Sequence, residues 1–377
     1  MTAVAAPLRI VAIAPLRFPI VPPFAGGLES AVWNEVRMLR ARGHRVDLIA
    51  TEGSDFLDPS IPAFTLPAAD WAGDPQAADD TYPPGYLDRA LPALGRALDL
   101  VGRSADSYDV IVNHCLHGLP LERAGSLGVP MVSTLHTPVV PELAESHHRA
   151  AGRRSRFLSV SRHTSATWQS AGIVSRVLHN GVDADTWGEG PGGERLVWFG
   201  RIVPEKAPHL ALETARLLGM PLVVAGRIGD RDYYDREVAP RLDETRVHVG
   251  ALDTPDLAAL VGRSACTLTT PVWDEPFGLV TPESLLCGTP VAGFAAGGVT
   301  EIAEGTPGVE LVAPGDLEAL AAAVKRLVES EGQDAGSRRR IRAAAVERFS
   351  LTARAGALEA VLSDVADRGR ADTETVA

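Results

Sequence analysis

The sequence predicts an α/β protein built from two doubly wound domains, each with a parallel sheet. Short apolar runs alternate with segments of helical period along the chain, the pattern of parallel strands joined by helices. The pattern stops at "GVDADTWGEGPGGE" (181–194), a Gly-, Pro- and Asp-rich linker, and then begins again. A length of 377 residues is enough for two domains of ordinary size. Parallel sheets bind ligands beyond the carboxyl ends of their strands, so we expect these ends to face each other across a cleft.

The first half of the chain supplies six strand candidates. The region 28–42 between two of them is predicted to be a helix, because Leu28, Val32, Val36 and Leu39 recur on one face and Gly43 is a likely stop. Residues 51–90, rich in Pro, Asp and Ala, are expected to form a long irregular insertion, either a rim of the cleft or surface filler. The predicted strands are 8–14, 45–50, 109–113, 130–135, 156–160 and 175–178.

The second half repeats this organisation. Helices are predicted at 207–218, 254–263, 279–287 and 316–330 from their apolar period. The predicted strands are 195–199, 221–225, 246–249, 266–269, 290–294 and 309–313.

Composition narrows the function classes. The chain is 45% hydrophobic and 22% charged, and its formal net charge is −12, which argues against nucleic acid or an anionic membrane as the main partner. Its three cysteines are widely spaced and fit neither a disulfide framework nor a zinc site. The apolar start "LRIVAIAPL" is too short to span a membrane and is expected to be a buried strand. We expect a cytoplasmic protein.

The stretch "WDEPFGLVTPESLLCGTP" (273–290) is the first candidate for chemistry. It places Glu275 before a predicted helix start and Glu283 about one turn inside the helix. Free amide N–H groups near Gly278 and Leu279 would attract an anion such as a phosphate, with the two acids binding hydroxyl groups on either side. Alternatively, Glu275 offsets the helix dipole and Glu283 is solvated. The stretch alone does not separate these interpretations.

Three further segments favour an anion site. "FGRIVPEK" (199–206) puts Arg201 and Lys206 after a strand, where both could reach phosphate oxygens. "FAGGLES" places Gly26 and Gly27 before a helix in the other half, although a glycine pair is also common in plain turns. His136 follows the strand 130–135 and could bind a sugar hydroxyl or shuttle a proton. His114 and His117 are weaker candidates.

Taken together, these segments resemble the family-4 retaining glycosyltransferases of the GT-B fold. The resemblance rests on the Glu-x7-Glu stretch "EPFGLVTPE", "GRIVPEK", "GGLE", "LHNGVD", "RVHVGAL" and "GGVTEI", in matching order along nearly the whole chain, and is weakest at 51–100. It implies two Rossmann-like domains, an acceptor-side domain at 1–183 and a nucleotide-sugar-binding domain at 184–340, with a helix at 341–365 crossing back to the first.

The resemblance also implies roles for individual residues. Arg201 and Lys206 would bind the donor diphosphate, Glu283 the ribose hydroxyls and Glu275 the donor sugar, with His136 beside the sugar. Backbone groups would complete the site: Phe277 and Gly278 by the sugar, Leu279 and Val280 at the phosphates, Val249 and Gly250 against the base, and Gly26 and Gly27 at the phosphate site from the first domain.

The expected reaction is transfer of a hexosyl group from a nucleoside-diphosphate sugar, UDP-linked on family frequency, to a hydroxyl of a small soluble acceptor. No Asp-x-Asp pair sits at a strand end and no nucleophile is evident. We therefore expect no metal and no bound cofactor, and the resemblance implies front-face attack that forms an α-glycosidic bond. A sugar-nucleotide epimerase on the same fold and a transferase with a lipid-linked acceptor are the alternatives. No nucleic-acid partner and no membrane association are expected.

Overall fold

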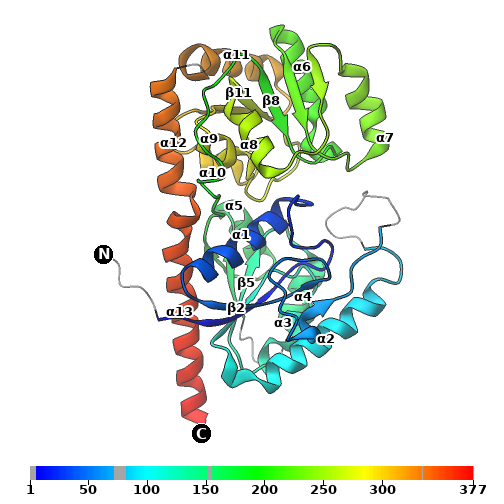
Figure 1. Ribbon diagram of the computed structural model, residues 1–377, viewed down its shortest axis with the longest axis vertical. Helices are drawn as coiled ribbons and strands as arrows, with labels where there is room; N and C mark the ends of the chain where they lie inside the picture. The colour runs from blue at the N-terminus through cyan, green and yellow to red at the C-terminus, as the bar shows by residue number, and fades with distance from the viewer. Residues whose placement is uncertain (1–5, 72–81, 151–154, 333, 377) are drawn as a thin grey trace. The chain divides into compact units, whose positions relative to one another are not determined.

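A computed structural model of the chain describes residues 6–71, 82–150, 155–332 and 334–376 (Figure 1). It divides into two compact units. The N-terminal unit comprises the described residues up to His179 together with those from Arg354 onward, and the C-terminal unit comprises Asn180–Ala353. Each unit is an α/β structure with one parallel sheet, so the predicted fold class is confirmed.

The N-terminal unit contains a seven-stranded sheet in the order β3-β2-β1-β4-β5-β6-β7, with parallel pairing throughout. The central strands are buried on both faces, which explains why they are nearly continuous apolar runs in the sequence. The strands are β1 (Arg9–Ile13), β2 (Arg45–Thr51), β3 (Thr65–Leu66), β4 (Val110–Asn113), β5 (Met131–Leu135), β6 (Ser155–Ser159) and β7 (Arg176–Val177).

Helices cover both faces of this sheet. On one face, Leu94 and Leu98 of α2 join Val11 and Ile111 of the strands in one buried apolar cluster. On the other, Ile10 and Val112 of the strands are buried as well. Arg354 of α13 donates to Glu35 of α1. The helices are α1 (Gly27–Ala41), α2 (Leu87–Arg103), α3 (Leu119–Arg123), α4 (Pro141–Arg149), α5 (Arg162–Ser170) and α13 (Leu351–Val376).

The region 51–90 is less irregular than expected. It contains the short strand β3, which extends the sheet at Ala50↔Thr65 and Thr51↔Leu66, and it ends in the first turn of α2. A two-residue strand is too short for a periodicity signal, so the pattern could not reveal it. Residues 72–81 of this region lie outside the described residues.

The C-terminal unit has a six-stranded parallel sheet in the order β10-β9-β8-β11-β12-β13. Helices α6 and α11 pack on one face, where Leu212 and Leu320 join Leu222 and Phe294 in a buried cluster. The strands are β8 (Leu196–Phe199), β9 (Leu222–Ala225), β10 (Arg246–His248), β11 (Cys266–Thr269), β12 (Val291–Phe294) and β13 (Val309–Val312). The helices are α6 (Pro208–Leu218), α7 (Arg231–Tyr233), α8 (Thr254–Gly262), α9 (Val280–Leu286), α10 (Val299–Ala303), α11 (Leu317–Leu327) and α12 (Ala335–Phe349).

The C-terminal helix expected at 341–365 is divided into two, α12 and α13, at Ser350. The backbone there leaves the helical region, with φ −69° and ψ 156°, and the Ser350 hydroxyl accepts a hydrogen bond from the amide of Ala353. The backbone on either side of Ser350 is hydrogen-bonded to Val182. Serine is a favoured helix N-cap, so the break has a local cause that the apolar period did not show.

The segment 181–194, expected as a linker, is packed inside the C-terminal unit. A Cβ at Gly190 would lie 2.2 Å from the carbonyl oxygen of Gly262, and one at Gly193 would lie 2.2 Å from that of Arg263. The buried guanidinium of Arg338 donates to the carbonyl oxygens of Gly190 (3.1 Å) and Gly262 (3.0 Å). The glycines are therefore needed for close backbone approach rather than for flexibility.

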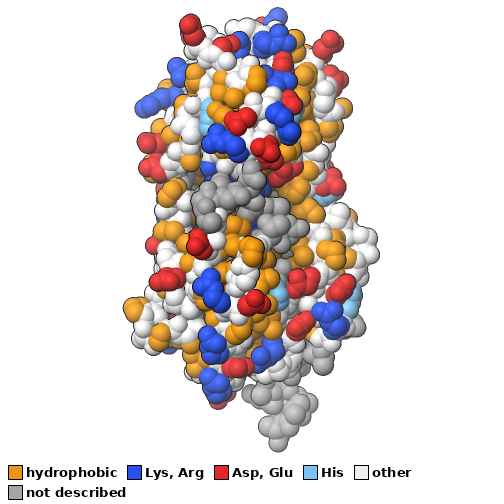
Figure 2. Space-filling view, turned by 90° about the vertical axis from the view of Figure 1, so that its right-hand side faces the viewer, with side chains coloured by type: hydrophobic (Ala, Val, Ile, Leu, Met, Phe, Trp, Pro, Cys, Tyr) orange, Lys and Arg blue, Asp and Glu red, His pale blue; other side chains and the backbone are white. Residues whose placement is uncertain are grey.

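Charges of both signs are mixed on the face shown in Figure 2. Within the described ranges, no helix combines the length and the apolar composition that a membrane span requires.

Candidate active site

The C-terminal unit has a topological switch point between β8 and β11. The chain continues from β8 outward to β9 and β10 and then returns to β11 on the other side. The loops after β8 and β11 therefore diverge, and such a point is the usual ligand crevice of an open parallel sheet. The predicted segments "GRIVPEK" and "WDEPFG" form these two loops.

Lys206 and Glu275 meet at this switch point. The Lys206 ammonium forms an ion pair with the Glu275 carboxylate, and the Trp273 indole N–H donates to the same carboxylate oxygen (2.9 Å). The ammonium also lies 4.9 Å from the centre of the Trp273 ring, within the range of a cation–π interaction. The sequence placed Lys206 and Glu275 in one site, but it did not indicate that they touch, nor that Trp273 belongs with them.

A buried threonine fixes the Lys206 loop. The Thr270 hydroxyl lies 3.0 and 2.9 Å from the carbonyl oxygens of Lys206 and Ala207, to which it donates, and it accepts from the Trp198 indole N–H (3.1 Å). Ala207 has φ +47°, a conformation that non-glycine residues rarely adopt. Thr270 directly follows β11 in "TLTTP", and this position was the only sequence signal for it.

Arg201 lies in the same loop and pairs with Glu205 at 3.6 Å. Its neighbour Gly200 is in close contact with the loop after β9, because a Cβ at Gly226 would lie 1.8 Å from the Gly200 oxygen. Gly-Arg-Ile occurs after both strands, and the two isoleucines, Ile202 and Ile228, form a parallel bridge. This repeat, overlooked in the sequence, holds the two loops side by side.

Gly297 and Gly298 are in close contact with the backbone of Glu275. Gly298 N–H donates to the Glu275 carbonyl (2.7 Å), and a Cβ at Gly297 would lie 2.3 Å from the same oxygen. Gly278, with φ +86°, also has no room for a side chain, because a Cβ there would lie 2.7 Å from Val299. These glycines bring the backbone close around Glu275.

Glu283 lies in the first turn of α9. Its side chain is partly exposed, and no hydrogen bond or ion pair is found for the carboxyl group within the described residues. Burial raises the pKa of Glu283 from 4.5 to about 8. A shielded carboxyl without donors is costly, and ligand hydroxyl groups would relieve that cost.

The other residues predicted for the site in this unit differ in how far they are buried. Phe277 is buried and packs edge-on against Phe349, at 6.4 Å between ring centres. Leu279 and Val280 are partly exposed at the start of α9. Val249 is 45% exposed after β10, and Gly250, with φ +78°, has no atom within 4 Å of its Cβ position, so this corner is open.

In the N-terminal unit, Gly26 is the N-cap of α1 and Gly27 its first residue. Gly26 has φ −165°, so no left-handed conformation requires glycine there. Glu29 is buried in the first turn, with its carboxylate 3.2 Å from where a Gly26 Cβ would lie. A carboxylate already occupies the positive end of this helix dipole, and a phosphate would share that position with it.

His136 follows β5 and takes part in a buried chain of hydrogen bonds. Its Nε2 lies 2.9 Å from His114 Nδ1, and His114 Nε2 lies 3.1 Å from Glu35 Oε1. Burial lowers the pKa of His136 well below its ordinary value, so the ring is neutral near pH 7. By contrast, His117 is held by Glu142 (3.2 Å) and by the Leu119 amide (3.1 Å).

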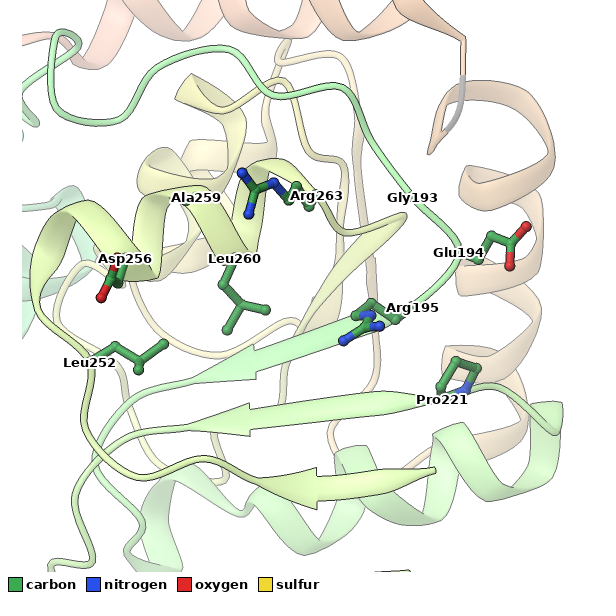
Figure 3. Close-up of a pocket in the computed structure, with 9 residues that line it drawn as sticks. All are labelled: Gly193, Glu194, Arg195, Pro221, Leu252, Asp256, Ala259, Leu260 and Arg263. Carbon is green, nitrogen blue, oxygen red and sulfur yellow. The ribbon is translucent and has the colours of Figure 1, made fainter. Parts of the chain in front are cut away.

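A groove of about 690 Å³ lies elsewhere on the C-terminal unit (Figure 3). Arg195 and Pro221 on its wall directly precede β8 and β9. The groove therefore extends to the amino ends of these strands, whereas the switch point lies at their carboxyl ends. No residue predicted for the site lines it.

Two family descriptions match the chain. "Glycosyl transferases group 1" matches residues 185–348, and "Glycosyltransferase Family 4" matches residues 25–186. Glycogen synthase of Mycobacterium tuberculosis is 31% identical in a 251-residue alignment that covers 57% of this chain and 58% of that protein. D-inositol 3-phosphate glycosyltransferase of Mycobacterium bovis is 34% identical in a 196-residue alignment that covers 47% of this chain and 40% of that protein. The chain thus spans about half the length of these relatives.

Solved structures share the fold. HepE of Anabaena, in complex with UDP and glucose, has a TM-score of 0.69 at 20% identity and covers 94% of this chain and 99% of its own. Sucrose-phosphate synthase of Thermosynechococcus elongatus has a TM-score of 0.73 at 18% identity, covering 95% and 99%. Because the two family descriptions together span residues 25–348 and the solved relatives have the same two-domain fold, the chain belongs to the family-4 glycosyltransferases with the GT-B fold.

Proposed function

We propose that this protein is a retaining glycosyltransferase that moves a hexosyl group from a UDP-sugar to a hydroxyl group of a small soluble acceptor. The product is an α-glycoside, and the reaction requires no metal ion. The observation that carries the proposal is the Lys206–Glu275 ion pair at the switch point. It is supported by the Glu283 carboxyl of α9, for which no hydrogen bond or ion pair is found within the described residues.

The side chains suit the charge changes of this reaction. The bond between the anomeric carbon and the leaving phosphate oxygen breaks, and a bond to the acceptor oxygen forms on the same face. The acceptor's proton passes to the departing diphosphate. Negative charge develops on that group, where Lys206 and Arg201 would stabilise it through preorganised positive charge. Glu275, released from part of its contact with Lys206, would accept hydrogen bonds from the donor sugar.

The comparisons favour this donor class. HepE was solved in complexes with UDP and glucose and with UDP-glucose. The names of the relatives refer to different products and acceptors, namely glycogen and D-inositol 3-phosphate. The acceptor proposed here therefore rests on the near-neutral N-terminal half, which has 16 basic and 18 acidic residues up to position 183.

The test begins with thermal shift and calorimetry against UDP-, GDP- and ADP-linked hexoses. Hydrolysis or transfer of the stabilising donor is then followed with a panel of soluble acceptors, and the anomeric configuration of the product is read by NMR. We expect a UDP-sugar to bind, an α-linked product, and activity that survives a chelator. A β-linked product, or activity lost with the chelator and restored by Mn²⁺ or Mg²⁺, would contradict the mechanism.

The same experiment separates the alternatives. An epimerase would convert the nucleotide sugar into its epimer with no acceptor present. A transferase for lipid-linked acceptors would transfer only to acceptors presented in detergent or vesicles.

A further inference from the structure

A cluster of four charged or titratable side chains lies within the N-terminal unit. Glu35 comes from α1, His114 follows β4, His136 follows β5, and Arg354 comes from α13. The side chains of Glu35, His114 and Arg354 are 5%, 2% and 5% exposed. Buried polar groups of this kind are costly unless every donor and acceptor is matched, so the direction of each hydrogen bond can be worked out.

The starting point is the acid. Glu35 accepts from Arg354 at 2.8 Å on one oxygen and faces His114 Nε2 at 3.1 Å with the other. Burial alone would raise the pKa of Glu35, but the charge of Arg354 and the hydrogen bonds with Arg354 and His114 lower it below its usual range. An ionised carboxylate can only accept, so His114 must carry a proton on Nε2.

The next contact follows from the first. Only one proton can lie between His114 Nδ1 and His136 Nε2, which are 2.9 Å apart. Arg354 already balances the charge of Glu35, so a neutral His114 leaves the buried cluster without net charge. With its proton on Nε2, such a ring has a bare Nδ1, which accepts from His136 Nε2–H. A neutral His136 with its proton on Nε2 then has a bare Nδ1. Within the described residues, that nitrogen has no hydrogen-bond partner.

We propose that Glu35 and His114 are positioning residues that set the tautomer of His136, so that His136 Nδ1 presents a lone pair to a hydroxyl group of the carbohydrate ligand. This role rests on the proposed function, because the hydroxyl belongs to the donor or acceptor of that reaction. Arg354 completes the arrangement by balancing the charge of Glu35, and it donates to the Leu178 carbonyl as well (3.1 Å). The C-terminal helix α13 thus contributes directly to the polarity of His136.

The cluster predicts an unusual effect of Glu35→Gln. Arg354 has only donors, so the carbonyl oxygen of the new side-chain amide must turn toward it and the amide NH₂ toward His114. His114 Nε2 then has to accept, which moves its proton to Nδ1. His136 Nε2 accepts that proton's hydrogen bond, and His136 carries its own proton on Nδ1. One substitution without change of shape should invert both tautomers.

The chain offers a matched control at a second buried histidine–glutamate pair in the same unit. His44 Nε2 lies 3.0 Å from Glu359 of α13, and His44 Nδ1 accepts from the Leu8 amide at 3.0 Å. This pair also joins α13 to the unit, but no further histidine follows it within the described hydrogen bonds. His44→Asn therefore reports what the loss of a buried histidine does to stability alone.

The experiment is histidine-selective ¹⁵N NMR on the full chain, which has ten histidines, with signals assigned by single substitution. We expect Nε2–H tautomers for His114 and His136 in the wild type and Nδ1–H tautomers in Glu35→Gln. Transfer from UDP-glucose should fall in kcat by about tenfold or more in Glu35→Gln and in His114→Asn. His44→Asn should keep the wild-type kcat and the His136 tautomer.

A wild-type His136 protonated on Nδ1, or unchanged tautomers in Glu35→Gln, would overturn the inference. The wild-type measurement needs no variant, so it decides even if a variant fails to fold. A protein with the expected tautomers that binds no nucleotide sugar would instead overturn the proposed function and the ligand assigned to His136, while the tautomer assignment would stand.

Discussion

Lys206 and Glu275 form an ion pair between the loops that follow β8 and β11, and both side chains are also in contact with Trp273. The two residues are 69 positions apart in the chain and come together because β8 and β11 are neighbours in the sheet. Glu275 holds the Lys206 ammonium in place before any ligand is present. An anionic ligand at this switch point would therefore meet a cation that is already oriented.

Replacing Lys206 with alanine should weaken nucleotide binding. Hydrogen bonds to charged groups contribute about 1.5–3 kcal/mol, so the Kd for UDP should rise roughly 10- to 150-fold. Isothermal titration calorimetry measures this directly. The chain has only one other lysine, Lys325, which is exposed and 3.9 Å from Glu329, and Lys325→Ala serves as the control. Equal affinities in the two variants would remove Lys206 from the site.

Glu283 should link donor binding to pH. The pKa of its carboxyl is about 8 in the free protein, and ribose hydroxyl groups that donate to the carboxylate would lower it. Binding then releases a proton, so affinity should increase with pH, by at most about tenfold per unit, and level off above about pH 8. Glu283→Gln should bind with a flat pH profile. A wild-type profile that is equally flat between about pH 6 and 8 would contradict the ribose assignment.

The same group should affect stability with the opposite trend. The unfolded chain loses the Glu283 proton near pH 4.5, whereas the folded protein keeps it until about pH 8. The free energy of unfolding should therefore decrease as the pH rises between these values. Urea unfolding at about pH 9 should show Glu283→Gln to be more stable than the wild type. Glu318→Gln, at an exposed position of α11, should show no such gain.

Thr270→Val should impair the site without changing its shape. The substitution leaves the Trp198 indole and the carbonyls of Lys206 and Ala207 without their partner, at a cost of about 1–3 kcal/mol. Since the strained Ala207 turn loses its support, we expect weaker UDP binding as well as a lower Tm. Thr270→Ser should restore both. A Thr270→Val protein with reduced Tm but unchanged Kd would show that the hydroxyl group serves stability alone.

Arg338→Met should destabilise the C-terminal unit. The guanidinium is buried and hydrogen-bonded to carbonyl oxygens of several segments, including Gly190, Gly262 and Cys287. Leaving such acceptors buried and unpaired should cost roughly 3 kcal/mol or more. Equilibrium urea unfolding tests this, with Arg339→Met at the adjacent exposed position as the control. A difference below about 0.5 kcal/mol between the two variants would be inconsistent with this role.

Local patterns are sufficient to predict most of the secondary structure. Apolar runs predict twelve strands, and each corresponds to an observed strand within about two residues at either end. The central strands are buried on both faces, so their apolar character is continuous and easy to detect. The short strand β3 and the break at Ser350 are missed because two residues, or one cap, leave no periodic signal.

The fold class, the family resemblance and the two loops that carry Lys206 and Glu275 follow from residue types at fixed spacings along the chain. The three-dimensional arrangement was needed to learn that Lys206 and Glu275 are paired and that Thr270 and Gly297 support them. The same holds for the surroundings of His136, to which α1, the loop after β4 and α13 contribute. Each of these contacts joins segments far apart in sequence, and the order of strands in a sheet, rather than any local pattern, determines which loops meet.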